Sequence, residues 1–175
     1  QAMQTPVIEY KKILYATDLS DSGRTAFPYA ASIARLNNST LTVFHVLKPT
    51  KIENYLVGYI DEELWSEIKT RDLEEVKNIL VNRKRDDTAI KKCVDEFCKE
   101  TLIASEERPY ISYDIKVVTG DPVSEIIREA SDGNYDLVVI GKRGAGLIKE
   151  TVMGTTARRV IRHCVRPVMV IPLSH

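Results

Sequence analysis

Short apolar runs alternate along the chain with longer segments in which apolar residues recur at helical spacing. Five apolar runs predict strands, at residues 10–17, 41–46, 112–118, 137–140 and 168–171. Continuous apolar runs of this length are typical of strands buried on both faces. Amphipathic spacing predicts helices at about 18–36, 61–81, 86–103, 122–132 and 155–164. This alternation predicts an α/β fold with a parallel sheet and helices on both faces.

Two prolines bear on where these helices begin. Asp121 precedes Pro122, which places a capping carboxylate and a proline at the start of a helix that ends before Gly133. Pro28 lies inside the first helical pattern, where it either falls near a first turn or bends the helix.

Length, charge and cysteine content narrow the class of protein. The 175 residues fit a single domain, expected over residues 4–175, with Gln1 and Ala2 as a remnant before a candidate initiator Met3. Lys plus Arg and Asp plus Glu both number 25, so no overall field favours nucleic acid or a membrane surface. No secretory leader or membrane-spanning run is visible. The chain has an odd number of cysteines, and they lack the spacing of a metal site. They are expected to be buried free thiols in a reducing cytoplasm, at Cys93, Cys98 and Cys164.

A glycine-rich segment directly follows the fourth predicted strand and ends at the last helix. Its spacing is Gly-x2-Gly-x9-Gly-Thr, and its candidate phosphate-binding residues are Gly141, Lys142, Arg143, Gly144, Ala145, Gly146, Gly154, Thr155 and Thr156. Glycine at a strand end admits a ligand close to the backbone, and a helix N-terminus attracts anions. The alternative is a surface turn. The side chains of Lys142 and Arg143 either pair with phosphate oxygens or are solvated charges.

This segment resembles that of the nucleotide-binding members of the universal stress protein family, and the resemblance covers residues 10–172. It implies a doubly wound five-stranded sheet in the order 3-2-1-4-5, the adenine nucleotide alpha hydrolase-like fold. It also implies ATP, or ADP or AMP, as the ligand, with Mg²⁺ as a possible companion. The chain departs from the family at Ala16, where proline is usual, at Lys142, where serine or arginine is common, and at Ala157, where many members carry a second hydroxyl.

With that strand order, the ligand crevice lies between the first and fourth strands, where the winding direction reverses. Ala16, Thr17 and Asp18 at the end of the first strand should therefore meet Gly141 there. The resemblance places Asp18 near the ribose and the metal-bound phosphates, and Val46 against adenine. The plain alternatives are a helix cap for Asp18 and an ordinary strand residue for Val46.

Other chemical motifs are absent or incomplete. No G-x-x-x-x-G-K-[ST] motif occurs, and Lys149 stands where a dinucleotide fingerprint starting at Gly144 needs glycine. His45, beside the expected crevice, is interpreted as a packed or half-exposed imidazole rather than a catalytic group. The arginine run from Arg158 to Arg166 is interpreted as solvated surface or the periphery of the phosphate site.

The sequence therefore predicts a cytoplasmic stress-response protein that binds an adenine nucleotide and acts as a regulatory module. It is at most a slow ATPase, because no general base or arginine finger is evident. The alternative is a dimeric interaction module without nucleotide, docking through the long crossover at 48–109. The apolar last strand, between Pro167 and Pro172, is expected to pair with its copy in a homodimer. The alternative is a monomer in which residues 3–9 or the crossover helices cover this edge.

Overall fold

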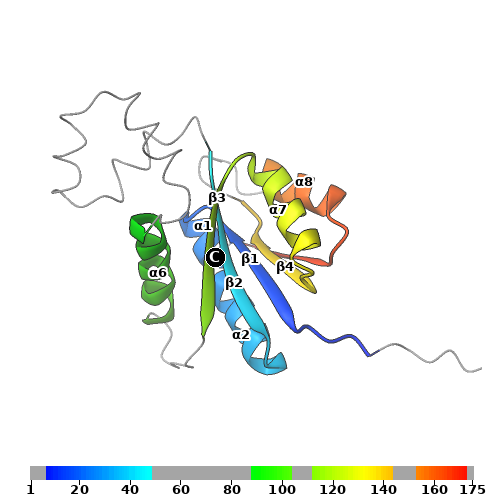
Figure 1. Ribbon diagram of the computed structural model, residues 1–175, viewed down its shortest axis with the longest axis horizontal. Helices are drawn as coiled ribbons and strands as arrows, with labels where there is room; N and C mark the ends of the chain where they lie inside the picture. The colour runs from blue at the N-terminus through cyan, green and yellow to red at the C-terminus, as the bar shows by residue number, and fades with distance from the viewer. Residues whose placement is uncertain (1–6, 49–87, 104–111, 144–152, 173–175) are drawn as a thin grey trace, which may run out of the picture.

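The computed structural model describes residues 7–48, 88–103, 112–143 and 153–172. Its elements in chain order are β1 (Lys12–Thr17), α1 (Asp21–Arg24), α2 (Phe27–Asn37), β2 (Thr40–Leu47), α6 (Thr88–Ile103), β3 (Tyr113–Thr119), α7 (Pro122–Asp132), β4 (Leu137–Gly141), α8 (Thr155–His163) and β5 (Val168–Ile171). All neighbouring strands are parallel, and the sheet order is β3-β2-β1-β4-β5 (Figure 1). The predicted fold class and strand order are confirmed.

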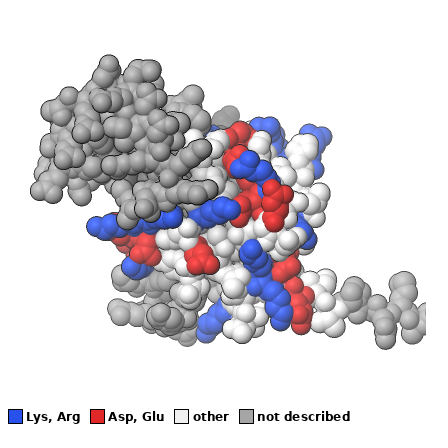
Figure 2. All heavy atoms as spheres, viewed as in Figure 1, with Lys and Arg blue, Asp and Glu red and all other residues white. Residues whose placement is uncertain are grey.

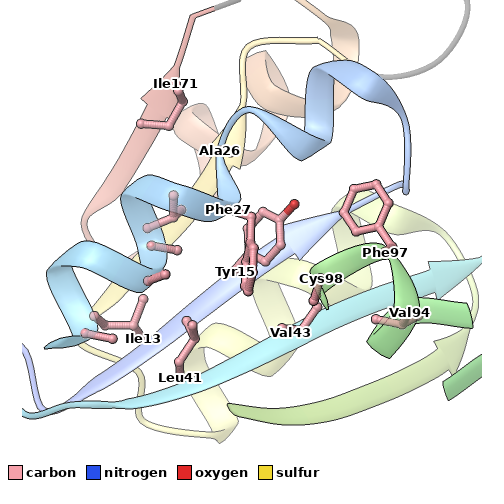
Figure 3. Packing of buried hydrophobic residues seen from close by; sticks show 14 of the residues in the cluster. Ile13, Tyr15, Ala26, Phe27, Leu41, Val43, Val94, Phe97, Cys98 and Ile171 are labelled. Carbon is pink, nitrogen blue, oxygen red and sulfur yellow. The ribbon is translucent and has the colours of Figure 1, made fainter. Parts of the chain in front are cut away.

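Each face of the sheet carries its own hydrophobic core. Successive strand residues point to opposite faces, so Ile13 and Tyr15 of β1 join one core while Leu14 and Ala16 join the other. Helices α1, α2 and α6 cover the first core, whose close packing is drawn in Figure 3, and α7 and α8 cover the second. The Tyr15 ring lies 5.2 Å from that of Phe27 at the centre of the first core. The sheet is therefore wrapped on both faces, as predicted.

The helix predicted at 18–36 is in fact two helices, and this prediction was wrong. α1 ends at Arg24 and α2 begins at Phe27, which places Pro28 in the first turn of α2. A proline there removes no helical hydrogen bond, whereas one inside a continuous helix would remove one. Pro28 therefore lies near a first turn, one of its two expected positions.

The remaining helix predictions hold wherever the structure describes the residues. Asp121 caps α7, accepting a hydrogen bond from the Ser124 backbone N–H at 3.0 Å, and Pro122 follows it. α6 corresponds to the helix predicted at 86–103, and α8 ends one residue before Cys164. The helix predicted at 61–81 lies outside the described residues.

β1 and β4 are fastened together at their amino ends. One carboxylate oxygen of Asp136, the residue before β4, accepts the backbone N–H groups of Lys11 and Lys12, each at 2.8 Å. The Asp136 N–H in turn donates to the Lys12 carbonyl at 2.8 Å. This contact sets the register of the two strands whose opposite ends form the expected crevice.

The described surface carries both signs of charge. Acidic and basic side chains are interspersed on the face drawn in Figure 2, in keeping with the zero net charge of the chain. Among the described segments, there is no helix with the length and apolar character that crossing a bilayer requires. Cys98, which is buried, and Cys164, which is partly buried, are free thiols as predicted, and burial raises the pKa of Cys98 to about 12.

Candidate functional site

The carboxyl ends of β1 and β4 lie side by side, although more than 120 residues separate them in the sequence. Ala16 pairs with Ile140, so Thr17 and Gly141 end their strands as neighbours. On the other side of β1, Thr17 pairs with His45 of β2. Because β1 lies between β2 and β4, this edge is the point at which the winding direction reverses. The structure thus brings the two predicted halves of the site together.

A tight turn leads the chain out of β1 and presents Asp18 to solvent. The Thr17 hydroxyl accepts the Leu19 N–H at 3.0 Å, and Leu19 adopts the left-handed conformation with φ 62°. Its side chain is buried in the first core, which holds this uncommon backbone geometry in place. The exposed Asp18 carboxylate accepts both the N–H, at 3.1 Å, and the hydroxyl of Ser20. This is an Asx turn, which fixes the direction of the carboxylate.

Asp18 does not cap the helix that follows it. Ser20 stands immediately before α1, and its hydroxyl oxygen accepts the Gly23 N–H at 3.1 Å. Ser20 therefore occupies the capping position, and the interpretation of Asp18 as a plain helix cap is wrong. The Gly23 carbonyl oxygen accepts a hydrogen bond from the buried Tyr15 hydroxyl at 2.7 Å.

Two successive residues of β2 lie next to the end of β1, buried on opposite faces of the sheet. His45 is 0% exposed, and its Nδ1 lies 2.8 Å from the Thr17 carbonyl oxygen. Burial lowers the pKa of His45, outweighing the opposite effects of this hydrogen bond and of the nearby Asp18 carboxylate. The prediction of a packed imidazole is confirmed. Val46 points to the opposite face, where it packs in the second core together with Ala16.

The glycine-rich segment is closed at its base by backbone hydrogen bonds. The Lys142 N–H donates to the Ile171 carbonyl at 2.7 Å, and the Lys142 carbonyl accepts the Gly154 N–H at 2.9 Å. The two ends of the Gly-x2-Gly-x9-Gly-Thr pattern are thus joined directly. The first bond within α8 runs from Arg158 N–H to the Gly154 carbonyl at 3.0 Å. The helix leaves its earlier N–H groups available for other acceptors.

Side chains around this base differ in exposure. Thr155 is exposed and Thr156 half-buried, both in the first turn of α8, and Lys142 is half-buried. Arg143 is only 8% exposed, so the description of a solvated surface charge does not apply to it. Gly154 has φ −60°, which any residue adopts, so its backbone angle does not require glycine. Gly144, Ala145 and Gly146 lie outside the described residues.

Asp18 carries a carboxylate, the type of oxygen ligand that Mg²⁺ accepts in proteins. Within the described ranges, no group of three His, Cys, Asp or Glu side chains is placed to hold a metal ion. An Mg²⁺ ion at Asp18 would therefore take its remaining ligands from phosphate and water, as this ion usually does. The exposed carboxylate, held by Ser20, fits that arrangement.

The turn after β1 also depends on Leu19, Ser20, Gly23 and the contact between His45 and Thr17, none of which was predicted for the site. Several polar residues precede α1, and which of them caps the helix depends on where α1 begins. Asp18 itself carries a signal, because an aspartate side chain readily accepts the backbone N–H two residues on and so forms an Asx turn.

Comparisons with known proteins agree with this fold. The model of the universal stress protein family matches residues 9–172. A universal stress protein of Methanocaldococcus jannaschii is 27% identical over 176 residues, which cover 94% of this chain and 96% of that protein. Its solved structure covers 97% of this chain and 99% of its own, with TM-score 0.65 and 26% identity. These structures share the adenine nucleotide alpha hydrolase-like fold.

Two further solved structures were determined with nucleotides. A universal stress protein in complex with cAMP covers 95% of this chain and 99% of its own, with TM-score 0.58 and 20% identity. A family protein of Arabidopsis thaliana with AMP bound covers 94% of this chain and 92% of its own, with TM-score 0.52 and 20% identity. At this identity the likeness to both is one of fold.

Proposed function

Because this chain belongs to the universal stress protein family, we propose that it binds an adenine nucleotide between the carboxyl ends of β1 and β4. The observation that carries the proposal is the joining of Lys142 to Gly154 directly beside the β1 exit turn. A glycine-rich loop and a helix N-terminus start from this base, and backbone N–H groups there suit phosphate oxygens. The solved relatives with cAMP and AMP support an adenine nucleotide as the ligand class.

The proposal assigns roles to the glycine-rich segment, to the start of α8 and to the two predicted residues Asp18 and Val46. The loop that starts at Gly141 wraps the phosphates, while Thr155 and Thr156 offer hydroxyl and N–H groups at the start of α8. Lys142 and Arg143 supply positive charge near the phosphates. Asp18 accepts ribose hydroxyls or holds Mg²⁺ together with the phosphates, and Val46 lies against adenine.

Calorimetry on Gly141→Val tests the phosphate assignment. A β-branched side chain at the end of β4 blocks backbone approach to phosphate, so ATP affinity should fall at least about tenfold while the melting temperature stays close to wild type. Thr119→Val is the matched control, because it places the same side chain at the carboxyl end of β3, away from the reversal point. Unchanged ATP affinity in Gly141→Val, and in the equivalent variant Gly144→Val, would show that the assignment is wrong.

Asp18→Ala tests the role of the carboxylate. We expect weaker binding chiefly when Mg²⁺ is present, because a carboxylate that helps hold the cation contributes little without it. The control is Asp132→Ala, which removes an exposed carboxylate from the end of α7. An equal loss with and without Mg²⁺ would assign Asp18 to the ribose instead.

The proposal also covers the biological setting. Nucleotide occupancy acts as a regulatory signal in the cytoplasm during stress, with hydrolysis at most slow, and the protein works as a homodimer paired through β5. The alternative, an interaction module without nucleotide, is decided by mass spectrometry of small molecules released when the purified protein is denatured. Release of ATP, ADP or AMP supports the proposal. A protein that releases none and binds none by calorimetry supports the alternative.

A further inference from the structure

His45 contacts the backbone of β1 at the residue that precedes Asp18. β1 ends at Thr17 while β2 continues to Leu47, so the chain leaves the sheet beside the imidazole. The Nδ1 atom lies 2.8 Å from the Thr17 carbonyl oxygen, within hydrogen-bonding distance. The His45 side chain of β2 thus binds the main chain of β1 where the turn after the strand begins.

The contact with Thr17 determines whether Nδ1 of His45 carries a hydrogen. A carbonyl oxygen only accepts hydrogen bonds, so Nδ1 must carry the hydrogen and donate it. Complete burial lowers the pKa of the imidazole, which favours its neutral form. A fully buried ring has no surface to offer a ligand, so any effect of His45 on the site passes through protein groups that it contacts, and the Thr17 carbonyl is one of these.

The turn that follows passes this constraint on to Asp18. Thr17 is held at its carbonyl by His45 and at its hydroxyl by the Leu19 N–H. The left-handed Leu19 is anchored in the first core, and Ser20 then binds back to the Asp18 carboxylate. Asp18 therefore lies between two anchored residues, and its direction depends on both anchors.

We propose that His45 is a positioning residue for nucleotide binding. Its Nδ1–H bond to the Thr17 carbonyl fixes the turn that presents Asp18 to the ribose and the metal-bound phosphates. This role rests on the proposed function, because it concerns the affinity of the same site. It assigns to His45 the pre-organisation of the carboxylate side of the site and leaves the glycine loop outside its influence.

Two substitutions separate the hydrogen bond from the packing. His45→Leu fills the buried position without a donor, whereas the amide N–H of His45→Asn can occupy the place of Nδ1–H. Calorimetry with ATP and Mg²⁺ should show an affinity about three- to tenfold lower for His45→Leu, the loss that one hydrogen bond explains. The affinity of His45→Asn should stay within about twofold of wild type. Circular dichroism confirms that both variants are folded. Equal losses in both variants would overturn the proposal.

A double-mutant cycle shows whether the effect passes through Asp18. In the Asp18→Ala background, His45→Leu should cause no further loss of affinity, because the group that it positions is gone. In the Thr155→Ala background, which alters the phosphate side, the full loss should remain. A further loss of the same size in both backgrounds would mean that His45 only supports the fold, and would overturn the proposal.

Amide hydrogen exchange, followed by NMR, measures the stability of the turn after β1 in the absence of ligand. The amides of Leu19 and Ser20 should exchange faster in His45→Leu than in His45→Asn, while that of Val139, in the middle of β4, should exchange alike in both. Wild type should show His45 as the neutral Nδ1–H tautomer. A wild-type protein that binds no adenine nucleotide overturns the proposed function and the ligand part of this inference. Unchanged exchange at Leu19 and Ser20 overturns the positioning itself.

Discussion

Tyr15→Phe removes a single oxygen from the centre of the first core, so its effect on stability can be estimated from few contacts. The hydroxyl donates to the Gly23 carbonyl at 2.7 Å, and the ring is completely buried. Phenylalanine preserves the ring and its 5.2 Å packing against Phe27. Burial raises the pKa of Tyr15, so the phenol stays protonated and the measurement does not depend on pH near neutrality.

The size of the effect depends on what remains for the Gly23 carbonyl. A buried acceptor left without any partner costs about 1–3 kcal/mol. The Gly23 carbonyl keeps the Ala26 N–H at 3.1 Å, so the cost should fall at the lower end of that range. We expect a loss of about 1–1.5 kcal/mol in the free energy of unfolding, which lowers the melting temperature by roughly 2–6 °C in a chain of this length.

Urea unfolding followed by circular dichroism measures this loss. Tyr29→Phe is the matched control, because the same oxygen is removed from an exposed tyrosine of α2, and it should change stability by less than about 0.5 kcal/mol. A Tyr15→Phe variant as stable as the control would refute the reasoning, since the bond to Gly23 would then contribute nothing. A loss above about 3 kcal/mol would refute it as well, because the bond to the Gly23 carbonyl, which keeps another partner, and the contact of the phenol with the Thr17 hydroxyl together cannot account for it.

Two further predictions concern α7 and β5. Asp121→Ala should cost about 1 kcal/mol at pH 7 in urea unfolding. The hydrogen bonds from Ser124 lower the pKa of Asp121, so the part of its contribution that depends on ionisation is present above the unfolded pKa of about 3.9 and is lost as pH falls through the folded pKa. A difference from wild type that does not shrink as pH falls from about 7 to below about 3.9 would contradict this origin. In sedimentation, the wild-type protein should be a dimer at micromolar concentration. The double variant Met169→Lys, Val170→Lys should be a folded monomer, because the charges prevent pairing through β5. The control Thr119→Lys, on the other edge strand β3, should stay dimeric. A monomeric wild type would rule out the dimer, and a dimer that survives the double substitution would place the contact elsewhere.

The parts of the fold that sequence predicted well depend on short-range signals. β5 has the bounds that its apolar run and flanking prolines indicate, and the start of α7 follows from Asp121 and Pro122. The prediction of one helix at 18–36 was wrong because the apolar spacing continues across the break between α1 and α2. Helical spacing reports which residues face the core, and it does not report a change in backbone direction between two short helices.

The features of the candidate site also differ in how far the sequence could predict them. The convergence of Thr17 and Gly141 followed from the strand order, which the resemblance supplied. The contact of His45 with Thr17 needs the register of β1 against β2, and a one-residue shift would turn the imidazole to the other face. The burial of Arg143 likewise depends on tertiary packing, because arginine at the end of a strand is usually exposed.

The central place of β1 in the sheet has a consequence for the growing chain on the ribosome. β1 is the first strand to be synthesised, yet its partner β4 ends only at Gly141. At about 5–20 residues per second, the edge of β1 that faces β4 waits on the order of ten seconds for its partner. During that time β1, β2 and β3 can pair with one another, while an apolar strand edge stays open to other nascent chains. Nascent chains that stop before Leu137 should therefore be captured by chaperones more strongly than those that have passed β5.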